Sequence, residues 1–228
     1  MVKIKWLGHA AILIDGSKKL LIDPYIKGNP VAKVDIDEII VDYILVTHGH
    51  PDHIGDTVYL AKKKNVPVLA IFEITAYLQS KGINEIVPMN IGGRKNFDFG
   101  WVKMVPAVHS SSIMEDGRII YAGSPAGFVI NIDGKTIYVA GDTALFKDME
   151  LIGELLKPEI AVLPIGDNFT MNTEEAIHAA RLLNVRRIIP VHYNTWDIIT
   201  VDMDIFKRKC NEHGVEPIIL EVNEEYEL

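Results

Sequence analysis

The chain has 228 residues, and its 23 Lys and Arg residues against 31 Asp and Glu residues give a formal net charge of −8. This acidic balance argues against a nucleic-acid partner, because such a partner needs a basic surface that displaces counterions from phosphates. The single cysteine, Cys210, excludes an intramolecular disulfide framework and is typical of a reducing compartment. No apolar run is long enough to cross a bilayer, so we expect a cytoplasmic protein without membrane contact.

Two β-hairpins are predicted about half a chain apart. In each hairpin, two short apolar runs flank an Asp-Gly pair, which is Asp15-Gly16 in the first hairpin and Asp133-Gly134 in the second. An Asp-Gly pair between two apolar runs predicts a hairpin, because glycine tolerates the positive φ of the tight turn. An aspartate also lies just beyond each second strand, Asp23 in the first case and Asp142 in the second. The chain therefore contains a weak internal repeat.

The remaining elements alternate between strands and helices. Besides the hairpins, the patterns predict strands at 2–6, 43–46, 68–71, 85–89, 102–108, 160–165, 187–191 and 218–220, and helices at 54–64, 74–80, 148–156, from 172 onward, and at 205–213. Such alternation is typical of an α/β layered domain with helices on the outer faces. We expect one domain over residues 1–228, composed of two similar halves at about 1–115 and 116–228.

The segment Thr47–His53 contains the pattern His-x-His-x-Asp-His at the end of a predicted strand. Neutral imidazoles and a carboxylate are ligands suited to Zn²⁺ and its first-row neighbours. In a tight loop, His48 and His50 can face one ion while Asp52 and His53 face a second. The pattern therefore predicts a metal site, and it is too specific to be expected by chance at this composition.

Further metal-ligating residue types follow other predicted strands. His109 follows the strand at 102–108, Asp142 follows the second hairpin, and His192 follows the strand at 187–191. Strand ends of α/β folds gather the loops that form binding sites. Together with the histidine-rich segment, these positions supply five histidines and two aspartates for two metals.

The sequence resembles the metallo-β-lactamase superfamily, and within it the small metal-dependent hydrolases related to L-ascorbate-6-phosphate lactonase. The matching segments span nearly the whole chain: Trp6–His9, Leu21–Pro24, Thr47–His53, His109, Gly141–Thr143, Pro164–Met171 and Pro190–Tyr193. The resemblance implies a four-layer αββα sandwich, which is the metallo-β-lactamase fold, with a dinuclear metal site at one edge.

The resemblance also implies a role for each ligand. It assigns one metal to His48, His50 and His109, the other metal to Asp52, His53 and His192, and the bridging position between them to Asp142. A hydroxide held between two divalent ions would then attack a carbonyl or phosphoryl centre, with Asp52 also able to handle a proton. Zn²⁺ is the first choice of metal, and the ligand set also suits Mn²⁺ or Fe²⁺.

Residue differences between this chain and several branches of the superfamily narrow the range of reactions that we expect it to catalyse. Metallo-β-lactamases proper commonly have cysteine where this chain has Asp142, and the diiron flavoproteins have glutamate where it has His50. We therefore expect hydrolysis of a small ester, lactone or phosphodiester. A dioxygenase-like metal-dependent oxidoreductase and a metal-binding sensor without turnover remain as alternatives. Two bound cations could attract an anionic small-molecule substrate to the site. The sequence does not indicate the oligomeric state.

Several other residues are candidates for the pocket or for support of the ligands. His9 either lies beside the site or is a hydrogen-bonded core histidine, and Asp23 is expected to accept a hydrogen bond from a ligating histidine. The loop 166–171, including Asp167 and Asn168, is expected to form a pocket wall. Tyr193 either donates to a substrate oxyanion or packs in the core.

Overall fold

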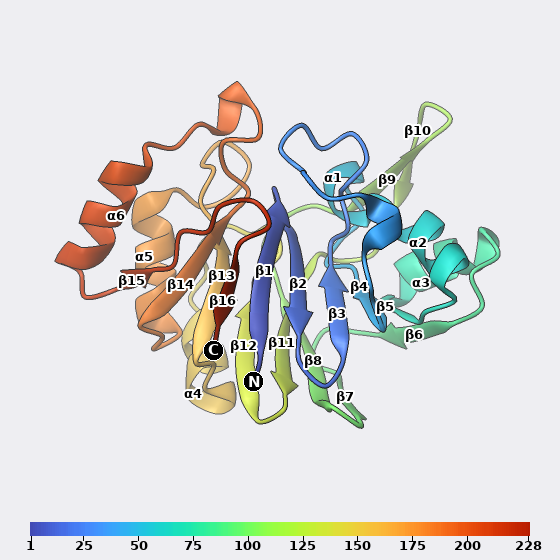
Figure 1. Ribbon diagram of the computed structural model, residues 1–228, viewed down its shortest axis with the longest axis horizontal. Coiled ribbons are helices and arrows are strands. Elements are labelled where there is room, and N and C mark those ends of the chain that lie inside the picture. Colours follow the sequence, from blue (N-terminus) through green and yellow to red (C-terminus); the bar gives the residue numbers. More distant parts are fainter.

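A computed structural model describes residues 1–228, and two mixed seven-stranded sheets form its centre (Figure 1). The first sheet has the order β16-β1-β2-β3-β4-β5-β6. Its strands are β1 (Lys3–Gly8), β2 (Ala11–Asp15), β3 (Lys19–Ile22), β4 (Tyr43–Leu45), β5 (Val68–Ile71), β6 (Ile86–Met89) and β16 (Glu225–Glu227). The pairs β1–β2 and β2–β3 are antiparallel, and the pairs from β3 to β6 are parallel.

The second sheet repeats this arrangement in the order β15-β14-β13-β12-β11-β8-β7. Its strands are β7 (Arg94–Phe97), β8 (Gly100–Pro106), β11 (Ala126–Ile132), β12 (Lys135–Val139), β13 (Ile160–Pro164), β14 (Arg187–Val191) and β15 (Glu216–Pro217). From β8 to β12 the pairing is antiparallel, and from β12 to β15 it is parallel. The chain leaves the first sheet at the end of β6, at Met89, and enters the second sheet at β7. This crossing comes earlier than the predicted boundary between the halves near residue 115.

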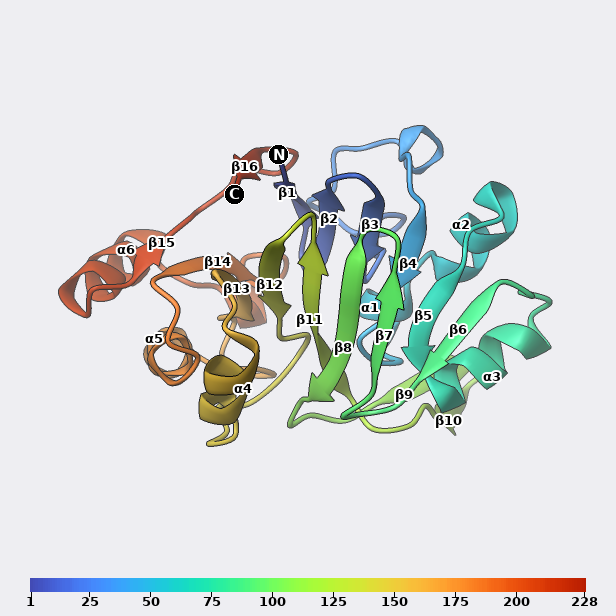
Figure 2. The same cartoon turned by 90° about the horizontal axis from the view of Figure 1, so that it is seen from below.

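Helices cover the outer faces of both sheets (Figure 2). They are α1 (Pro51–Ile54), α2 (Thr57–Lys64), α3 (Phe72–Ser80), α4 (Met149–Leu156), α5 (Thr173–Leu182) and α6 (Met203–Glu212). Helix α3 contacts β5 and β6 of the first sheet, whereas α5 and α6 contact β13 and β15 of the second. The predicted αββα sandwich is therefore confirmed. None of these helices combines the length and the apolar content that a membrane span requires.

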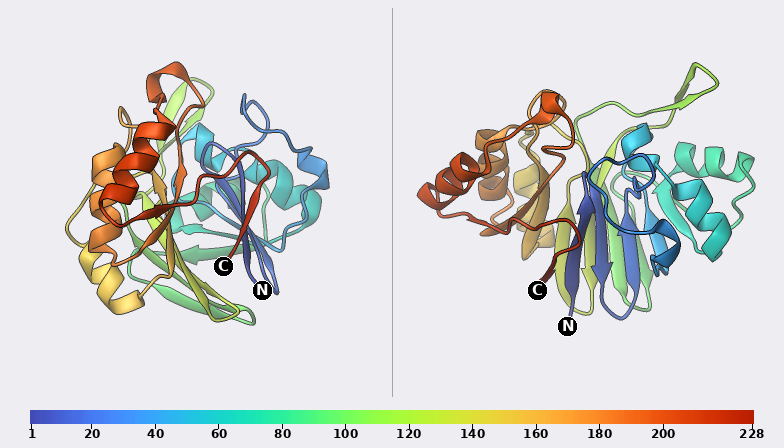
Figure 3. Two further views of the ribbon diagram at one scale, coloured as in Figure 1. Left: turned by 60° about the vertical axis from the view of Figure 1, so that its left-hand side comes forward. Right: turned by 45° about the horizontal axis from the view of Figure 1, so that its top comes forward.

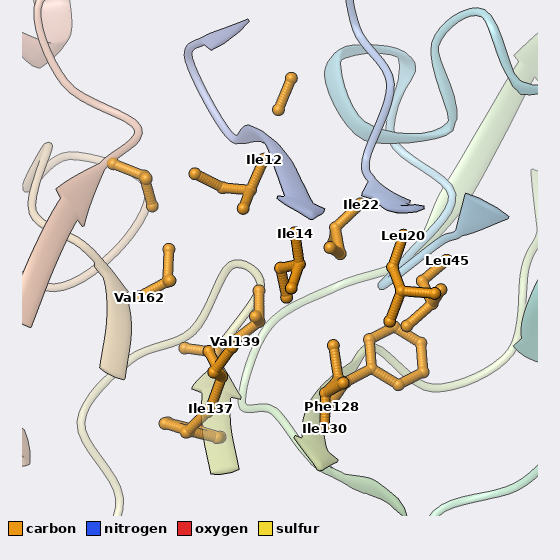
Figure 4. Packing of buried hydrophobic residues seen from close by; sticks show 14 of the residues in the cluster. Ile12, Ile14, Leu20, Ile22, Leu45, Phe128, Ile130, Ile137, Val139 and Val162 are labelled. Carbon is orange, nitrogen blue, oxygen red and sulfur yellow. The ribbon is translucent and has the colours of Figure 1, made fainter. Parts of the chain in front are cut away.

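The hydrophobic core lies between the two sheets (Figure 4). Alternate residues of the first hairpin face alternate residues of the second, because side chains on a strand alternate between its two faces. These residues are Ile12, Ile14, Leu20 and Ile22 from the first sheet and Phe128, Ile130, Ile137 and Val139 from the second, all buried. Burying each contributes roughly 1.5–3 kcal/mol, so the inter-sheet contact is a large stabilising term.

Two predicted elements differ from the structure. The predicted helix at 54–64 is interrupted at Gly55, where a Cβ atom would lie 2.5 Å from the carbonyl oxygen of Pro24. The predicted closing strand at 218–220 is irregular, although the amide of Ile218 donates to the carbonyl of Ile188. The last strand is instead β16, which pairs with β1 of the other sheet.

A two-stranded hairpin stands apart from both sheets (Figure 3). It consists of β9 (Ser112–Glu115) and β10 (Arg118–Tyr121), which were not predicted. Asp116 and Gly117 form its turn with φ values of 49° and 71°. The base of this hairpin, where both strands meet the rest of the chain, packs on the histidine-rich loop, since a Cβ atom on Gly49 would lie 2.5 Å from Cβ of Ala122 and 3.2 Å from the carbonyl carbon of Ser112.

Strand direction brings the candidate residues to one edge of the sandwich. His9, Asp23 and the Thr47–His53 segment follow β1, β3 and β4, which run in the same direction in the first sheet. In the second sheet, β8, β12 and β14 likewise share one direction, and His109, Asp142 and His192 follow them. The loops after these strands meet at the end of the sandwich opposite the chain termini (Figure 1).

Candidate metal centre

A first group of nitrogen donors comes from the loops after β4 and β8. His48, His50 and His109 each place a ring nitrogen within 4.8 Å of the others. The Nε2 atom of His48 lies 3.0 Å from Nδ1 of His50, and its Nδ1 atom lies 3.0 Å from the hydroxyl of Thr47. His48 is fully buried, whereas His50 and His109 are partly exposed to solvent. Three convergent imidazoles can hold one divalent ion.

A second group lies beside the first. Asp52, His53 and His192 converge with His9 so that one donor atom of each lies within 4.8 Å of the others. The Oδ2 atom of Asp52 lies 3.6 Å from Nε2 of His192 and 3.8 Å from Nε2 of His53. A carboxylate with two imidazoles is again a donor set suited to a first-row divalent ion.

Asp142 lies between the two groups. Its Oδ2 atom is 3.0 Å from Nε2 of His192, 3.3 Å from Nε2 of His53 and 3.7 Å from Nε2 of His109. One carboxylate therefore contacts histidines from both donor sets. The loop that carries Asp142 approaches the histidine-rich segment closely, since a Cβ atom on Gly141 would lie 2.9 Å from Cβ of Thr47.

Unsatisfied polar atoms indicate that these residues fit metal ions. Nε2 of His53 and Oδ1 of Asp142 are buried and make no hydrogen bond. Buried polar atoms are almost always hydrogen-bonded, so exceptions at a convergent donor set point to a missing ligand. The donor types, their convergence and these orphaned atoms are together consistent with bound metal.

Asp23 supports the second group from behind. Its Oδ2 atom accepts hydrogen bonds from Nδ1 of His53 at 2.8 Å and from the hydroxyl of Thr47 at 2.6 Å. Its Oδ1 atom accepts from the amide of Thr47 at 2.8 Å. A hydrogen bond at Nδ1 leaves Nε2 of His53 free and directs it toward the centre. This is the arrangement that the sequence analysis expected for Asp23.

His9 lies behind Asp52. Burial lowers the pKa of His9 to about 4, so its ring is neutral and carries one proton near pH 7. Its Nε2 atom lies 3.0 Å from Oδ2 of Asp52, and its Nδ1 atom lies 2.8 Å from the hydroxyl of Thr195. Because an ionised carboxylate only accepts hydrogen bonds, Nε2 donates to Asp52 and Nδ1 accepts from Thr195. His9 therefore orients Asp52.

The charges at the site stabilise one another. Burial alone would raise the pKa of Asp52, but the close contact with His192 and the hydrogen bond from His9 hold it below its usual range. Burial alone would lower the pKa of His192, but the charges of Asp142 and Asp52 beside it raise it to about 9. The charges of Asp142 and Asp23 likewise raise the pKa of His53, against the effect of burial.

Metal loading should therefore release protons. The carboxylates beside His53 and His192 raise the pKa of both rings, which favours their protonated forms in the metal-free protein, whereas a metal requires their neutral forms. We expect the release of about two protons per chain on loading at pH 7, one from each histidine. Metal affinity should rise with pH until His192 loses its proton near pH 9. Calorimetry in buffers of different ionisation enthalpy measures this release, and a proton-free, pH-independent loading would contradict it.

A cleft of about 690 Å³ opens above the two donor sets. Its lining includes five of the candidate ligands, His50, Asp52, His109, Asp142 and His192, and Phe169 of the predicted loop 166–171. It also includes four residues that the sequence analysis did not assign to the site, namely Tyr25, Ser110, Trp196 and Ile198. No spacing pattern marks these four positions. The sequence could have indicated them only through their closeness to candidate residues, since Trp196, for example, lies four residues after His192.

Three of the predicted pocket residues lie elsewhere. Asp167 and Asn168 are exposed and outside the lining of the cleft, and the loop 166–171 contributes Phe169 instead. Asp167 takes a positive φ of 62°, and its carbonyl accepts from the amide of Thr170, so this part of the loop turns away from the cleft. Tyr193 is buried and stacks on Trp6 with a ring-centroid distance of 5.4 Å, so it packs in the core.

The αββα layers and the donor sets at one edge define a metallohydrolase of the metallo-β-lactamase fold. Comparison with known families agrees, because the family model described as the β-lactamase superfamily domain matches residues 11–193. The chain belongs to this superfamily.

Several relatives cover the whole chain. A metal-dependent hydrolase of Archaeoglobus fulgidus is 46% identical over 100% of this chain and 99% of its own length. A metal-dependent hydrolase of Nanoarchaeum equitans is 49% identical over 100% of both chains. Among solved structures, Igni18, a metallo hydrolase from Ignicoccus hospitalis, has 35% identity and a TM-score of 0.89, and covers 100% of this chain and 99% of its own. The chain is thus a member of a family of metal-dependent hydrolases.

Proposed function

We propose that the chain is a dinuclear metallohydrolase that cleaves a small ester, lactone or phosphodiester. The observation that carries this proposal is the position of Asp142, which contacts His109 of the first donor set and His53 and His192 of the second. One ion would be held by His48, His50 and His109, and the other by Asp52, His53 and His192. Zn²⁺ suits both sets, and Mn²⁺ and Fe²⁺ are compatible with them.

Bound divalent ions would supply Lewis acidity and an activated water at neutral pH. Among the two carboxylates that contact the donor histidines, Asp52 is the more accessible, with a side chain 24% exposed against 4% for Asp142. Asp52 also lines the cleft, so it can hold a proton that leaves the attacking water and return it to the leaving group. The hydrogen bond from His9 keeps the carboxylate of Asp52 directed for this role.

The geometry favours hydrolysis over the two alternatives. A single-ion oxidative site would leave part of the second donor set unused, whereas Asp52, His53 and His192 converge here as a complete set. A sensor without turnover has no need for an open cleft of about 690 Å³ above the donors. The partner that this cleft suits is a small molecule.

The test combines metal analysis with turnover. Protein stripped by a chelator should be inactive on a panel of chromogenic esters, lactones and phosphodiesters, and two equivalents of Zn²⁺ per chain should restore activity. Replacement of Asp52 by Ala should lower kcat by about 10²- to 10⁴-fold, the range for loss of a proton-transferring group.

Asp37→Ala provides a matched control, because Asp37 is an exposed carboxylate paired with Lys63 on the surface. It should leave both metal content and kcat unchanged. Two bound ions with no turnover of any member of the panel would favour the sensor. Dioxygen consumption with iron-loaded protein would instead favour the oxidoreductase.

A further inference from the structure

Large apolar side chains surround the mouth of the cleft. Tyr25, Phe169, Trp196 and Ile198 line it and come from three separate loops, after β3, after β13 and after β14. Phe169 is 50% exposed, Trp196 37% and Ile198 59%. Exposed apolar residues that converge on one concave surface mark a binding site far more often than scattered ones do.

Two of these residues form an aromatic wall next to the second donor set. The ring of Trp196 lies 4.7 Å from that of His9 between centroids, and the ring of Tyr25 lies 6.4 Å from that of Trp196 at an angle of 40°. The hydroxyl of Tyr25 donates to the carbonyl of Gly28 at 2.7 Å, so this polar group is already occupied. The wall therefore offers ring surface beside Asp52.

The cleft provides no fixed cation. Its lining contains neither lysine nor arginine, and its histidines and carboxylates are the candidate ligands His50, Asp52, His109, Asp142 and His192. The other polar groups are uncharged: the phenol of Tyr25, the indole of Trp196 and the hydroxyl of Ser110, which lies 3.3 Å from Nε2 of His50. Anionic groups on a substrate are usually held by arginine or lysine, and nothing in this lining could pair with a charge away from the metals.

We infer that the substrate is an uncharged ester or lactone with an aromatic or branched apolar substituent. The substituent packs on Trp196, Tyr25 and Phe169 while the carbonyl lies over the donor sets. This inference rests on the proposed function and narrows it, because it replaces the expected attraction of an anionic substrate and excludes a phosphodiester as the preferred one. A volume of about 690 Å³ is sufficient for such a small molecule.

A binding experiment tests the subsite without turnover. Benzohydroxamic, acetohydroxamic and 4-carboxybenzohydroxamic acids share one metal-binding group, so their relative affinities for Zn²⁺-loaded protein report on the cleft. Benzohydroxamic acid should bind about 10-fold more tightly than acetohydroxamic acid, which corresponds to about 1.4 kcal/mol. 4-Carboxybenzohydroxamic acid should bind no more tightly than acetohydroxamic acid. In Trp196→Ala, benzohydroxamic and acetohydroxamic acids should bind equally well. In Phe72→Ala, which changes an exposed aromatic residue on α3, benzohydroxamic acid should still bind more tightly.

A kinetic experiment tests the same subsite in the reaction. The 4-nitrophenyl esters of butyrate and hemisuccinate share a leaving group and differ in acyl charge, so butyrate should have a kcat/KM about 10-fold higher. Trp196→Ala should lower kcat/KM for the phenylacetate ester more than for the acetate ester, so the ratio of the two kcat/KM values should fall about 10-fold.

The outcomes separate this inference from the proposed function. Tighter binding of the carboxylated hydroxamate, or equal binding of the benzo and aceto compounds, would overturn the inference. So would a higher kcat/KM for bis(4-nitrophenyl) phosphate than for the neutral esters, although that result would support a hydrolase. Preferential binding of benzohydroxamic acid with no turnover of any ester would support the apolar subsite and refute the proposed hydrolysis.

Discussion

Replacement of Asp142 by Asn is expected to abolish turnover and to weaken metal binding at both donor sets. The change keeps the shape of the side chain but removes its charge, and Oδ2 of Asp142 lies within 3.7 Å of His53, His109 and His192. Loss of a residue behind a metal ligand costs about 10- to 100-fold in affinity or activity, so loss of a shared ligand should exceed about 100-fold.

Metal content and kcat/KM of the purified variant measure this effect. Asp167→Asn is the matched control, because Asp167 is an exposed carboxylate outside the cleft and should retain two ions and full activity. An Asp142→Asn protein that keeps two ions per chain and turns over within about 10-fold of the wild type would show that Asp142 does not join the two sets.

Replacement of Asp23 by Ala is expected to have the largest effect on stability. Asp23 is 1% exposed, and its removal leaves the amide of Thr47 and Nδ1 of His53 without an acceptor in the interior. An unsatisfied buried donor costs about 1–3 kcal/mol, so two such donors should lower the free energy of unfolding by about 2–6 kcal/mol. The ring of His53 also loses the contact that directs Nε2 toward the metal.

Denaturant unfolding of the metal-free protein isolates the structural part of this effect, and Zn²⁺ titration measures the loss of affinity, expected at about 10- to 100-fold. Asp37→Ala should give a much smaller change, since Asp37 is exposed. If Asp23→Ala left both quantities as in the wild type, Asp23 would not support the site.

The candidate metal ligands could be located from the sequence because they follow strand ends that the hydrophobic pattern defines. The apolar runs before His48 and His192 form β4 and β14, and parallel strands deliver their following loops to one edge. The Asp133-Gly134 turn was recognised for the same reason, with φ values of 50° and 83° that suit an Asp-Gly pair. These assignments depend on local pattern and topology alone.

Other features depend on contacts that the pattern does not contain. The turn of β9–β10 has an Asp-Gly pair at Asp116-Gly117, but its flanking runs are short and mixed in polarity, so the hairpin was not recognised. Strand β16 carries Glu225 and Glu227 on either side of Tyr226, and it is fixed by pairing with β1 at the far end of the chain. The apolar run at 218–220 fits a strand pattern better than residues 225–227 do. Residues 225–227 nevertheless form the strand, because they pair with β1.

The cleft lining was the least predictable part of the site. Trp196 and Tyr25 lie in irregular loops and meet only because β3 and β14 belong to facing sheets. The loop at 166–171 was predicted as a whole, but its backbone turns so that Phe169 faces the cleft while Asp167 and Asn168 do not. Which side chain of a loop faces a site is set by its φ and ψ values, which composition does not specify.

The most direct test of the two-metal centre is an anomalous-diffraction map of crystals loaded with Zn²⁺. We expect two peaks, one among His48, His50 and His109 and one among Asp52, His53 and His192, with the carboxylate of Asp142 next to both. A single peak at full Zn²⁺ loading, or peaks away from these side chains, would contradict it.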